Sequence, residues 1–168
     1  MPETRSGGNI SAVRQPGKKT HPGPADVLLG AGVGVCALVL YVRTLTPTVL
    51  YYSVETFDSA HLQVIAYVLG IPSYTGYPTY AMLAHLFTYL PFGDPAYRVN
   101  LASAVFAALA VALVYALCRR LGAGRLASAA ASLAFGLSQT FWSQAVIAEV
   151  YTLHVLLMAL VLLVLLVW

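Results

Sequence analysis

The sequence predicts an all-α integral membrane protein with about four membrane-spanning helices and two short interfacial helices in its first outer loop. Hydrophobic residues fill 60% of the 168 positions, charged residues only 9%, and the mean hydropathy is +0.78, all far from the averages of soluble domains. Several segments lack Asp, Glu, Lys and Arg for roughly the 17 to 25 residues that a bilayer crossing needs. Because backbone groups in lipid must bond to one another, such segments are helices rather than open sheet.

Four apolar segments are the expected spans. The first is the shortest, because its apolar run covers only Val27 to Val42. It crosses the bilayer if Arg43 snorkels to the headgroups and the helix continues toward Pro47, the first residue that breaks it. Within a transmembrane domain of residues 26–168, we expect spans at about 27–46, 98–118, 126–142 and 148–168.

Basic residues fall into two groups, which orient the chain. One group lies in residues 1–25, a Gly-, Pro- and Ser-rich segment that we expect to be a disordered tail, and the other runs from Arg119 to Arg125. Short cytoplasmic loops collect Lys and Arg, so both groups are expected in the cytoplasm and the chain in the cell membrane, crossing it several times. Residues 43–98 and 140–149 then face outward. The net charge of +3 reflects this orientation rather than nucleic-acid binding.

The outer segment between the first two spans is expected to contain two short helices. The stretch from Gly70 to Pro78 is too dense in Gly and Pro to stay helical, so it separates them. Apolar residues spaced three and four apart predict amphipathic helices at about 58–69 and 79–90, lying along the outer interface. Asp58 is one of the residues that can cap the first helix.

A series of short motifs carries a family resemblance. The motifs are Asp58-Ser59-Ala60, Gln63 with Leu69-Gly70-Ile71-Pro72, Gly76-Tyr77-Pro78 with Tyr80, Pro91 through Leu101, Phe141-Trp142-Ser143-Gln144-Ala145, and Glu149 through Leu153. With these motifs the chain, from about Val27 onward, resembles the bacterial membrane proteins of DUF2723, a domain of unknown function related to the eukaryotic protein O-mannosyltransferases of the TMEM260 type. Such proteins resemble the GT-C glycosyltransferases. The resemblance implies an active site in the first outer loop and a donor sugar carried on a polyprenyl phosphate.

Asp58 is the expected catalytic residue. A donor with an isoprenoid tail stays in the bilayer, so its phosphate and sugar lie at the interface, beside the residues that follow the first span. Transfer to a hydroxyl needs a base that takes the proton as the bond to the anomeric carbon forms, and a carboxylate can do this. Position and family motif both favour Asp58. A purely structural role, as the cap of the following helix, explains the same residue about equally well.

Five further residues are expected to bind substrate: Glu149, Arg98, His61, Tyr77 and Tyr80. Arg98, or alternatively Arg43, offers positive charge to the leaving phosphate. Glu149 starts the last span, where an acid is costly without a partner, although the helix dipole alone also favours an acid there. The resemblance to GT-C enzymes makes Asp58 and Glu149 a possible pair of ligands for a divalent cation. The histidines lack the spacing of a metal-ligand pair and are more simply solvated or packed, and the tyrosines are more simply an interfacial belt.

Two departures from the family pattern favour a different function. The family usually has an acid where this chain has His61, and a His-Pro-Pro-Gly turn where it has Ser73 to Gly76. If those residues are needed, the chain is instead a degenerate membrane scaffold or a component of a lipid-carrier transporter. A helical protein that simply packs against a partner is a third alternative. Relatives have many more spans, so we expect this to be the amino-terminal part of a longer chain. The expected partners are membrane lipid, a polyprenyl-phosphate sugar and an unidentified acceptor, but no nucleic acid.

Overall fold

The computed structural model describes residues 23–49, 54–71 and 77–168, and the regular secondary structure within these ranges is entirely α-helical. This confirms the all-α prediction. The predicted disordered tail lies, as far as residue 22, outside the described residues. The helices are α1 (Pro24–Thr44), α2 (Val54–Val68), α3 (Pro78–Phe87), α4 (Pro95–Arg120), α5 (Arg125–Gly136), α6 (Gln139–Ala145) and α7 (Tyr151–Val167).

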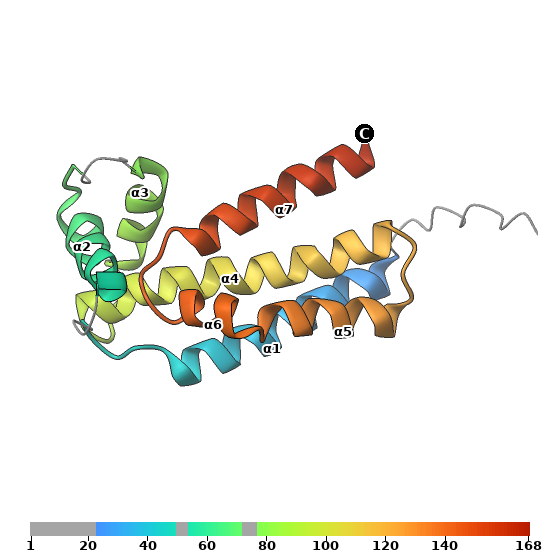
Figure 1. The fold of residues 1–168 in the computed structure, drawn as a ribbon, viewed down its shortest axis with the longest axis horizontal. Coiled ribbons are helices and arrows are strands. Elements are labelled where there is room, and N and C mark those ends of the chain that lie inside the picture. Colours follow the sequence, from blue (N-terminus) through green and yellow to red (C-terminus); the bar gives the residue numbers. More distant parts are fainter. Residues whose placement is uncertain (1–22, 50–53, 72–76) are drawn as a thin grey trace, which may run out of the picture.

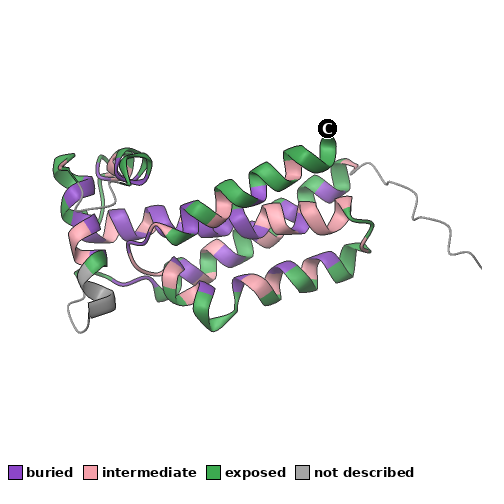
Figure 2. Cartoon of the chain, turned by 45° about the horizontal axis from the view of Figure 1, so that its top comes forward, coloured by how far each residue is buried: buried purple, intermediate pink, exposed green. Residues whose placement is uncertain are grey.

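Helix α4 is the centre of the molecule (Figure 1) and contacts all six other helices. Helices α2 and α3 lie beside its first turns, α1 and α5 run along it, and α7 diverges from it toward the C-terminal end. Many of its buried residues are small, which lets neighbouring helices approach closely: Ala96, Ala102, Ser103, Ala104, Ala107, Ala108 and Ala110. Figure 2 shows burial concentrated on α4, whereas α7 is exposed over most of its surface.

Two glycines lie at close contacts between helices. A Cβ atom on Gly34 of α1 would lie 3.1 Å from the Cβ of Ala112 on α4. A Cβ atom on Gly136, the last residue of α5, would lie only 2.7 Å from Cγ2 of Val111, also on α4. The carbonyl oxygen of Gly136 accepts a hydrogen bond of 2.7 Å from the hydroxyl of Tyr41, which is fully buried on α1. The ends of α1 and α5 are therefore tied together over the surface of α4.

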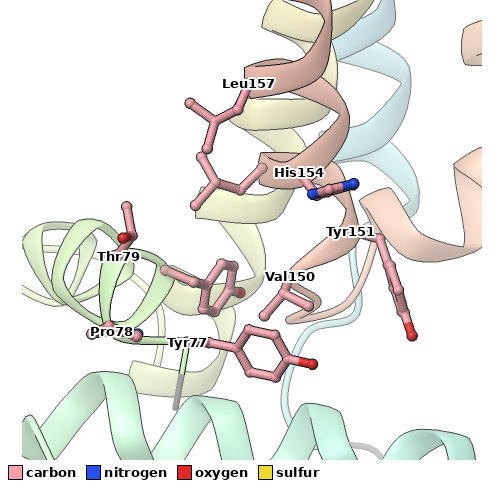
Figure 3. Close-up of a pocket in the computed structure, with 9 residues that line it drawn as sticks. Tyr77, Pro78, Thr79, Val150, Tyr151, His154 and Leu157 are labelled. Atoms are coloured by element: carbon pink, nitrogen blue, oxygen red, sulfur yellow. The ribbon is translucent and has the colours of Figure 1, made fainter. Parts of the chain in front are cut away.

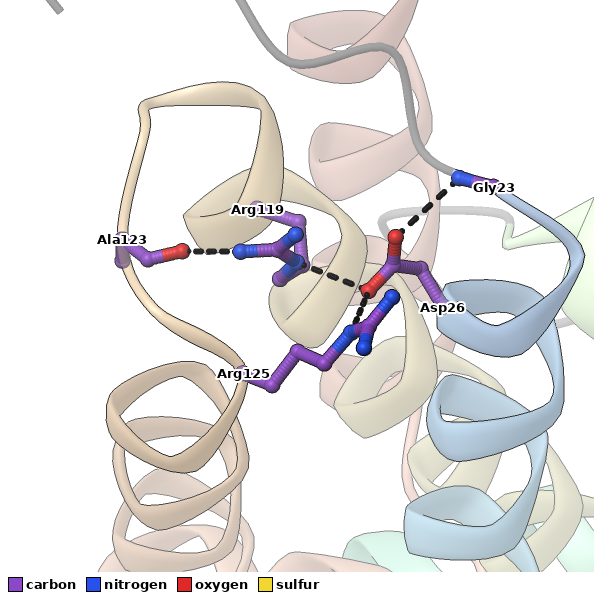
Figure 4. Close-up of polar contacts among 5 residues, drawn as sticks. All are labelled: Gly23, Asp26, Arg119, Ala123 and Arg125. Atoms are coloured by element: carbon purple, nitrogen blue, oxygen red, sulfur yellow. Dashed lines mark hydrogen bonds and ion pairs between the residues drawn. The ribbon is translucent and has the colours of Figure 1, made fainter.

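A shared carboxylate joins the start of α1 to the loop between α4 and α5 (Figure 4). Oδ1 of Asp26 accepts from Nε of Arg119 at 3.0 Å and from Nε of Arg125 at 2.9 Å. Its other oxygen accepts from the backbone N–H of Gly23 at 3.0 Å, and Arg119 also donates to the carbonyl oxygen of Ala123. This cluster lies at the opposite end of α4 from α2 and α3. The basic loop that the sequence assigns to the cytoplasm and the start of the first helix thus share one end of the molecule.

The described residues include two helices that are long and apolar enough to cross a membrane. These are α1, with 21 residues and a hydropathy of 2.1, and α4, with 26 residues and a hydropathy of 2.4. Helix α7 is apolar but has only 17 residues. The predicted span at 126–142 is divided, because α5 ends at Gly136 and α6 begins at Gln139. The hydroxyl of Ser138 donates to the carbonyl oxygen of Phe135 at 2.7 Å, which replaces a helical hydrogen bond at this break. The expected count of four spans is therefore not confirmed.

The two short helices of the outer segment are present, with shifted ends. Helix α2 begins at Val54 instead of 58, and α3 ends at Phe87 instead of 90. The end of α3 is tightened by Thr88, whose backbone N–H and hydroxyl both donate to the carbonyl oxygen of His85, at 2.9 and 2.7 Å. A buried amide pair fixes α2 on α4, since Nε2 of Gln63 donates to Oδ1 of Asn100 at 2.8 Å. Asn100 in turn donates to the carbonyl oxygen of Thr46 at 3.0 Å, just beyond α1.

Candidate functional site

Glu149 lies in the turn between α6 and α7, and hydrogen bonds fix its main chain from two sides. The residue is only 7% exposed. Its N–H donates to Oγ of Ser103 on α4 at 3.1 Å, and its carbonyl oxygen accepts from the same hydroxyl at 3.3 Å. The hydroxyl of Thr152, in the first turn of α7, also donates to this carbonyl oxygen at 3.4 Å. The turn is therefore anchored on the central helix.

Tyr80 extends this network to α3. Its hydroxyl lies 2.9 Å from Oγ of Ser103, and both side chains are almost completely buried. Burial raises the pKa of Tyr80 well above its usual range, so the phenol stays protonated at physiological pH. The ring also packs edge-on against Phe106 of α4, with centroids 6.3 Å apart. Tyr80 is thus a rigid, neutral member of the site rather than an acid or base.

Helix α2 brings Asp58 to the same turn. The hydroxyl oxygen of Ser59, the next residue, accepts a buried hydrogen bond of 3.1 Å from the N–H of Ala148. Asp58 itself is exposed. Burial, and then the negative charge of Asp58, raise the pKa of Glu149 to about 7 from an ordinary 4.5, while a hydrogen bond from the N–H of Val150 opposes part of the rise. The two carboxyl groups singled out in the sequence therefore lie within electrostatic reach of each other.

The interpretation of Asp58 as a helix cap is wrong. Because α2 begins at Val54, Asp58 lies in its second turn rather than at its N-terminal boundary. A cap acts by accepting hydrogen bonds from the free N–H groups of the first turn, which are behind Asp58 in this helix. Helix capping therefore does not explain why an exposed acid occupies position 58. The earlier start of α2 was not predicted, although no Gly or Pro separates residue 54 from residue 58.

A pocket of about 370 Å³ opens beside the Glu149 turn, between α3 and the start of α7 (Figure 3). Its apolar wall comes from Pro78, Val150, Leu153 and Leu157, and its polar groups come from Tyr77, Thr79, Tyr80, Tyr151 and His154. The ring of Tyr77 extends from the start of α3 toward Val150. The structure therefore places the two predicted tyrosines in one pocket. His154, which the sequence suggested to be simply solvated or packed, also lines this pocket, and an imidazole on an otherwise apolar helix is itself a signal of function.

Arg98 and His61 occupy different surroundings from this pocket. The guanidinium of Arg98 donates to three carbonyl oxygens of the turn before α4, those of Thr88, Phe92 and Gly93, at 2.8 to 2.9 Å. Three of its five N–H donors are thus used to hold that turn. His61 is half-buried on α2, three residues after Asp58. Neither residue lines the pocket.

A metal centre with a full ligand set is not apparent within the described residues. No group of three or more His, Cys, Asp or Glu side chains gathers in the described ranges. Asp58 and Glu149 offer the oxygen ligands that Mg²⁺ or Ca²⁺ prefers, and Mg²⁺ in particular is often held by only one or two carboxylates together with substrate phosphate. The pair is therefore compatible with a cation bound jointly with a substrate.

Comparisons with known proteins agree on one family. The model of the family described as Protein O-mannosyl-transferase TMEM260 N-terminal domain matches residues 58–168. A mouse (Mus musculus) relative, Protein O-mannosyl-transferase TMEM260, is 37% identical over 127 residues, which cover 75% of this chain and 18% of the mouse protein. The chain thus spans less than a fifth of the length of that relative. No solved structure is significantly similar to this chain.

Proposed function

Because the chain belongs to the family of the protein O-mannosyl-transferase TMEM260 N-terminal domain, we propose that it forms part of a membrane glycosyltransferase of the GT-C type. The proposed reaction moves a sugar from a polyprenyl-phosphate carrier to an acceptor hydroxyl on the outer face of the membrane. The observation that carries the proposal is the pairing of an exposed carboxyl, Asp58, with a buried one, Glu149, beside a pocket at the end of apolar helices. Two carboxyls in unequal environments can take different roles in one reaction.

In this mechanism Asp58 is the base. Its exposure lets an acceptor hydroxyl approach it, and its carboxylate takes the proton as the oxygen bonds to the anomeric carbon of the sugar. The bond between that carbon and the phosphate oxygen breaks, and the electron pair leaves with the polyprenyl phosphate. Charge is balanced because one proton moves to Asp58 while the phosphate gains one negative charge.

The pocket between α3 and α7 is the proposed place for the donor. Its apolar wall suits the first part of an isoprenoid chain, and the hydroxyls of Tyr77 and Tyr151 with the imidazole of His154 can bond to sugar or phosphate oxygens. Arg98 keeps two N–H groups beyond those bonded to its turn, so it remains a proposed contact for the leaving phosphate. A divalent cation, where the reaction uses one, would be held by Asp58 and Glu149 and would neutralise phosphate charge.

The test compares two carboxylate variants of the full-length protein. Asp58→Asn should lower sugar transfer from a synthetic polyprenyl-phosphate mannose by roughly 100-fold or more, because the base is lost. Asp94→Asn is the matched control: Asp94 accepts from the N–H of Tyr97 at 2.7 Å as the N-cap of α4, and asparagine caps a helix equally well. Unchanged turnover in Asp58→Asn would reject the base assignment. A protein that binds polyprenyl phosphate but never transfers sugar would instead support the scaffold or lipid-carrier alternative.

A further inference from the structure

Three hydroxyl groups, one from each of three helices, hold the turn that carries Glu149. Ser59 of α2 accepts from the N–H of Ala148 at 3.1 Å. Ser103 of α4 accepts from the N–H of Glu149 at 3.1 Å and donates to its carbonyl oxygen at 3.3 Å. Tyr80 of α3 contacts Ser103 at 2.9 Å. The turn lies 46 residues from Ser103 and 89 from Ser59 in the sequence, so folding alone brings these groups together.

The hydrogen-bonding capacity of Ser103 is completely used. A serine hydroxyl offers one donor and two acceptor sites. The donor goes to the carbonyl oxygen of Glu149, and one acceptor site receives the N–H of Glu149. The hydroxyls of Ser103 and Tyr80 share the third hydrogen bond, at 2.9 Å, in which either can be the donor. These contacts hold both main-chain polar groups of Glu149, and Tyr80 holds the hydroxyl that makes them.

Two other buried hydroxyls in the described residues lack such bonds. Ser128 and Tyr115 are as buried as Ser103 and Tyr80, but neither hydroxyl has a hydrogen-bond partner among the residues that the structure describes. Burial of a hydroxyl is therefore not enough to place it in a network here. The bonded pair of Ser103 and Tyr80 occurs where α2, α3 and α4 meet the Glu149 turn.

We propose that Ser103 and Tyr80 are positioning residues, which hold the Glu149 carboxyl at a fixed separation from Asp58. The proposal rests on the proposed function, because the separation matters only where the two carboxyls act on one substrate. Neither residue needs to touch the reacting atoms. Loss of either bond frees the turn to shift, and a small displacement of a positioned group costs roughly 100-fold in rate when it approaches 1 Å.

The experiment uses two substitutions and two matched controls in the full-length protein. Ser103→Ala and Tyr80→Phe each remove one bonded hydroxyl, whereas Ser128→Ala and Tyr115→Phe remove equally buried hydroxyls that have no partner. We expect the first pair to lower kcat for sugar transfer roughly 10- to 100-fold while KM for the donor stays within about twofold. The controls should leave both constants unchanged.

A second measurement does not depend on activity. Nitroxide labels at positions 58 and 151, both exposed, report the separation of α2 from the start of α7, with Cys36 and Cys118 replaced by alanine. We expect the distance distribution to broaden in Ser103→Ala and Tyr80→Phe and to stay narrow in the controls. If Ser103→Ala does not fold, Tyr80→Phe decides, since it removes one oxygen atom only.

The outcomes separate this proposal from the proposed function. An unbroadened distribution in Ser103→Ala and Tyr80→Phe overturns the positioning role, as does an unchanged kcat in an active enzyme or an effect confined to KM. If the unmodified protein transfers no sugar from any polyprenyl-phosphate donor, the proposed function fails. The label distances alone then decide whether these hydroxyls position the turn.

Discussion

Replacing Glu149 with glutamine should make the protein more stable at alkaline pH and alter how its stability depends on pH. Glu149 is 7% exposed, and burial together with the charge of Asp58 raises its pKa to about 7. Glutamine has nearly the same shape and carries an oxygen that can still accept from the N–H of Val150. The substitution therefore removes the charge with little change in packing.

The magnitude follows from the pKa difference. The folded protein holds the Glu149 proton up to about pH 7, whereas the unfolded chain releases it near 4.5. Because the folded-state pKa is raised, the protonated group favours the fold at low pH, and this contribution is lost as the pH rises from 4.5 to 7. One pKa unit corresponds to about 1.4 kcal/mol, so the loss is about 3 kcal/mol. Glutamine does not ionise, so the Glu149→Gln variant does not lose this stability as the pH rises.

The assay is reversible unfolding in mild detergent, with the protein and the Glu149→Gln variant measured side by side. We expect the stability of the variant relative to the unmodified protein to rise by about 3 kcal/mol between about pH 4 and about pH 8.5. Asp58→Asn provides a second arm. It removes the smaller cause of the raised pKa, so most of the pH dependence should survive. Parallel stability curves for the protein and Glu149→Gln across this range would refute the reasoning, because they would mean that Glu149 ionises freely in the fold.

Two further predictions concern the helix contacts. Gly136→Ala should destabilise the protein by roughly 1–3 kcal/mol in the same assay, since the new Cβ meets Val111 at 2.7 Å, whereas Gly32→Ala, with nothing within 4 Å, should be neutral or stabilising. Equal changes in stability for Gly136→Ala and Gly32→Ala would show that α5 can move away from α4 at little cost in free energy. At the other end, Arg119→Gln should lower the melting temperature more than Arg125→Gln, because their side chains are 13% and 56% exposed and exposed ion pairs contribute little. A larger decrease of the melting temperature in Arg125→Gln would mean that the ion pair of Arg125 with Asp26 contributes more to stability.

Features of the sequence that act locally predicted the fold well. Apolar composition indicated helices throughout, and Asp94 before Pro95 marks the start of α4, where its side chain caps the helix. The break after Gly136 escaped prediction because the span was drawn from the absence of charged residues, and residues 126–142 contain none. The polar residues Ser138, Gln139 and Thr140, which follow the break, were the local signal. The sequence also identified Asp58 and Glu149, since carboxyls are rare in such a chain. It did not predict Ser59 or Ser103 as their supports, because a serine in an apolar segment looks the same whether or not its hydroxyl has a partner.

The distribution of buried polar groups along the molecule distinguishes a site from ordinary packing. At the end formed by α2, α3 and the Glu149 turn, buried polar residues gather and bond to one another or to the neighbouring main chain: Thr46, Ser59, Gln63, Asn100, Ser103, Glu149 and Thr152. Apolar side chains would fill the same space without desolvating polar atoms or raising the pKa of an acid. Stability alone therefore does not account for them, and Glu149 lowers stability at neutral pH and above. Natural proteins keep polar groups that lower stability where function requires them. The cost of burying these groups therefore indicates a functional site at this end of α4, without reference to any related protein.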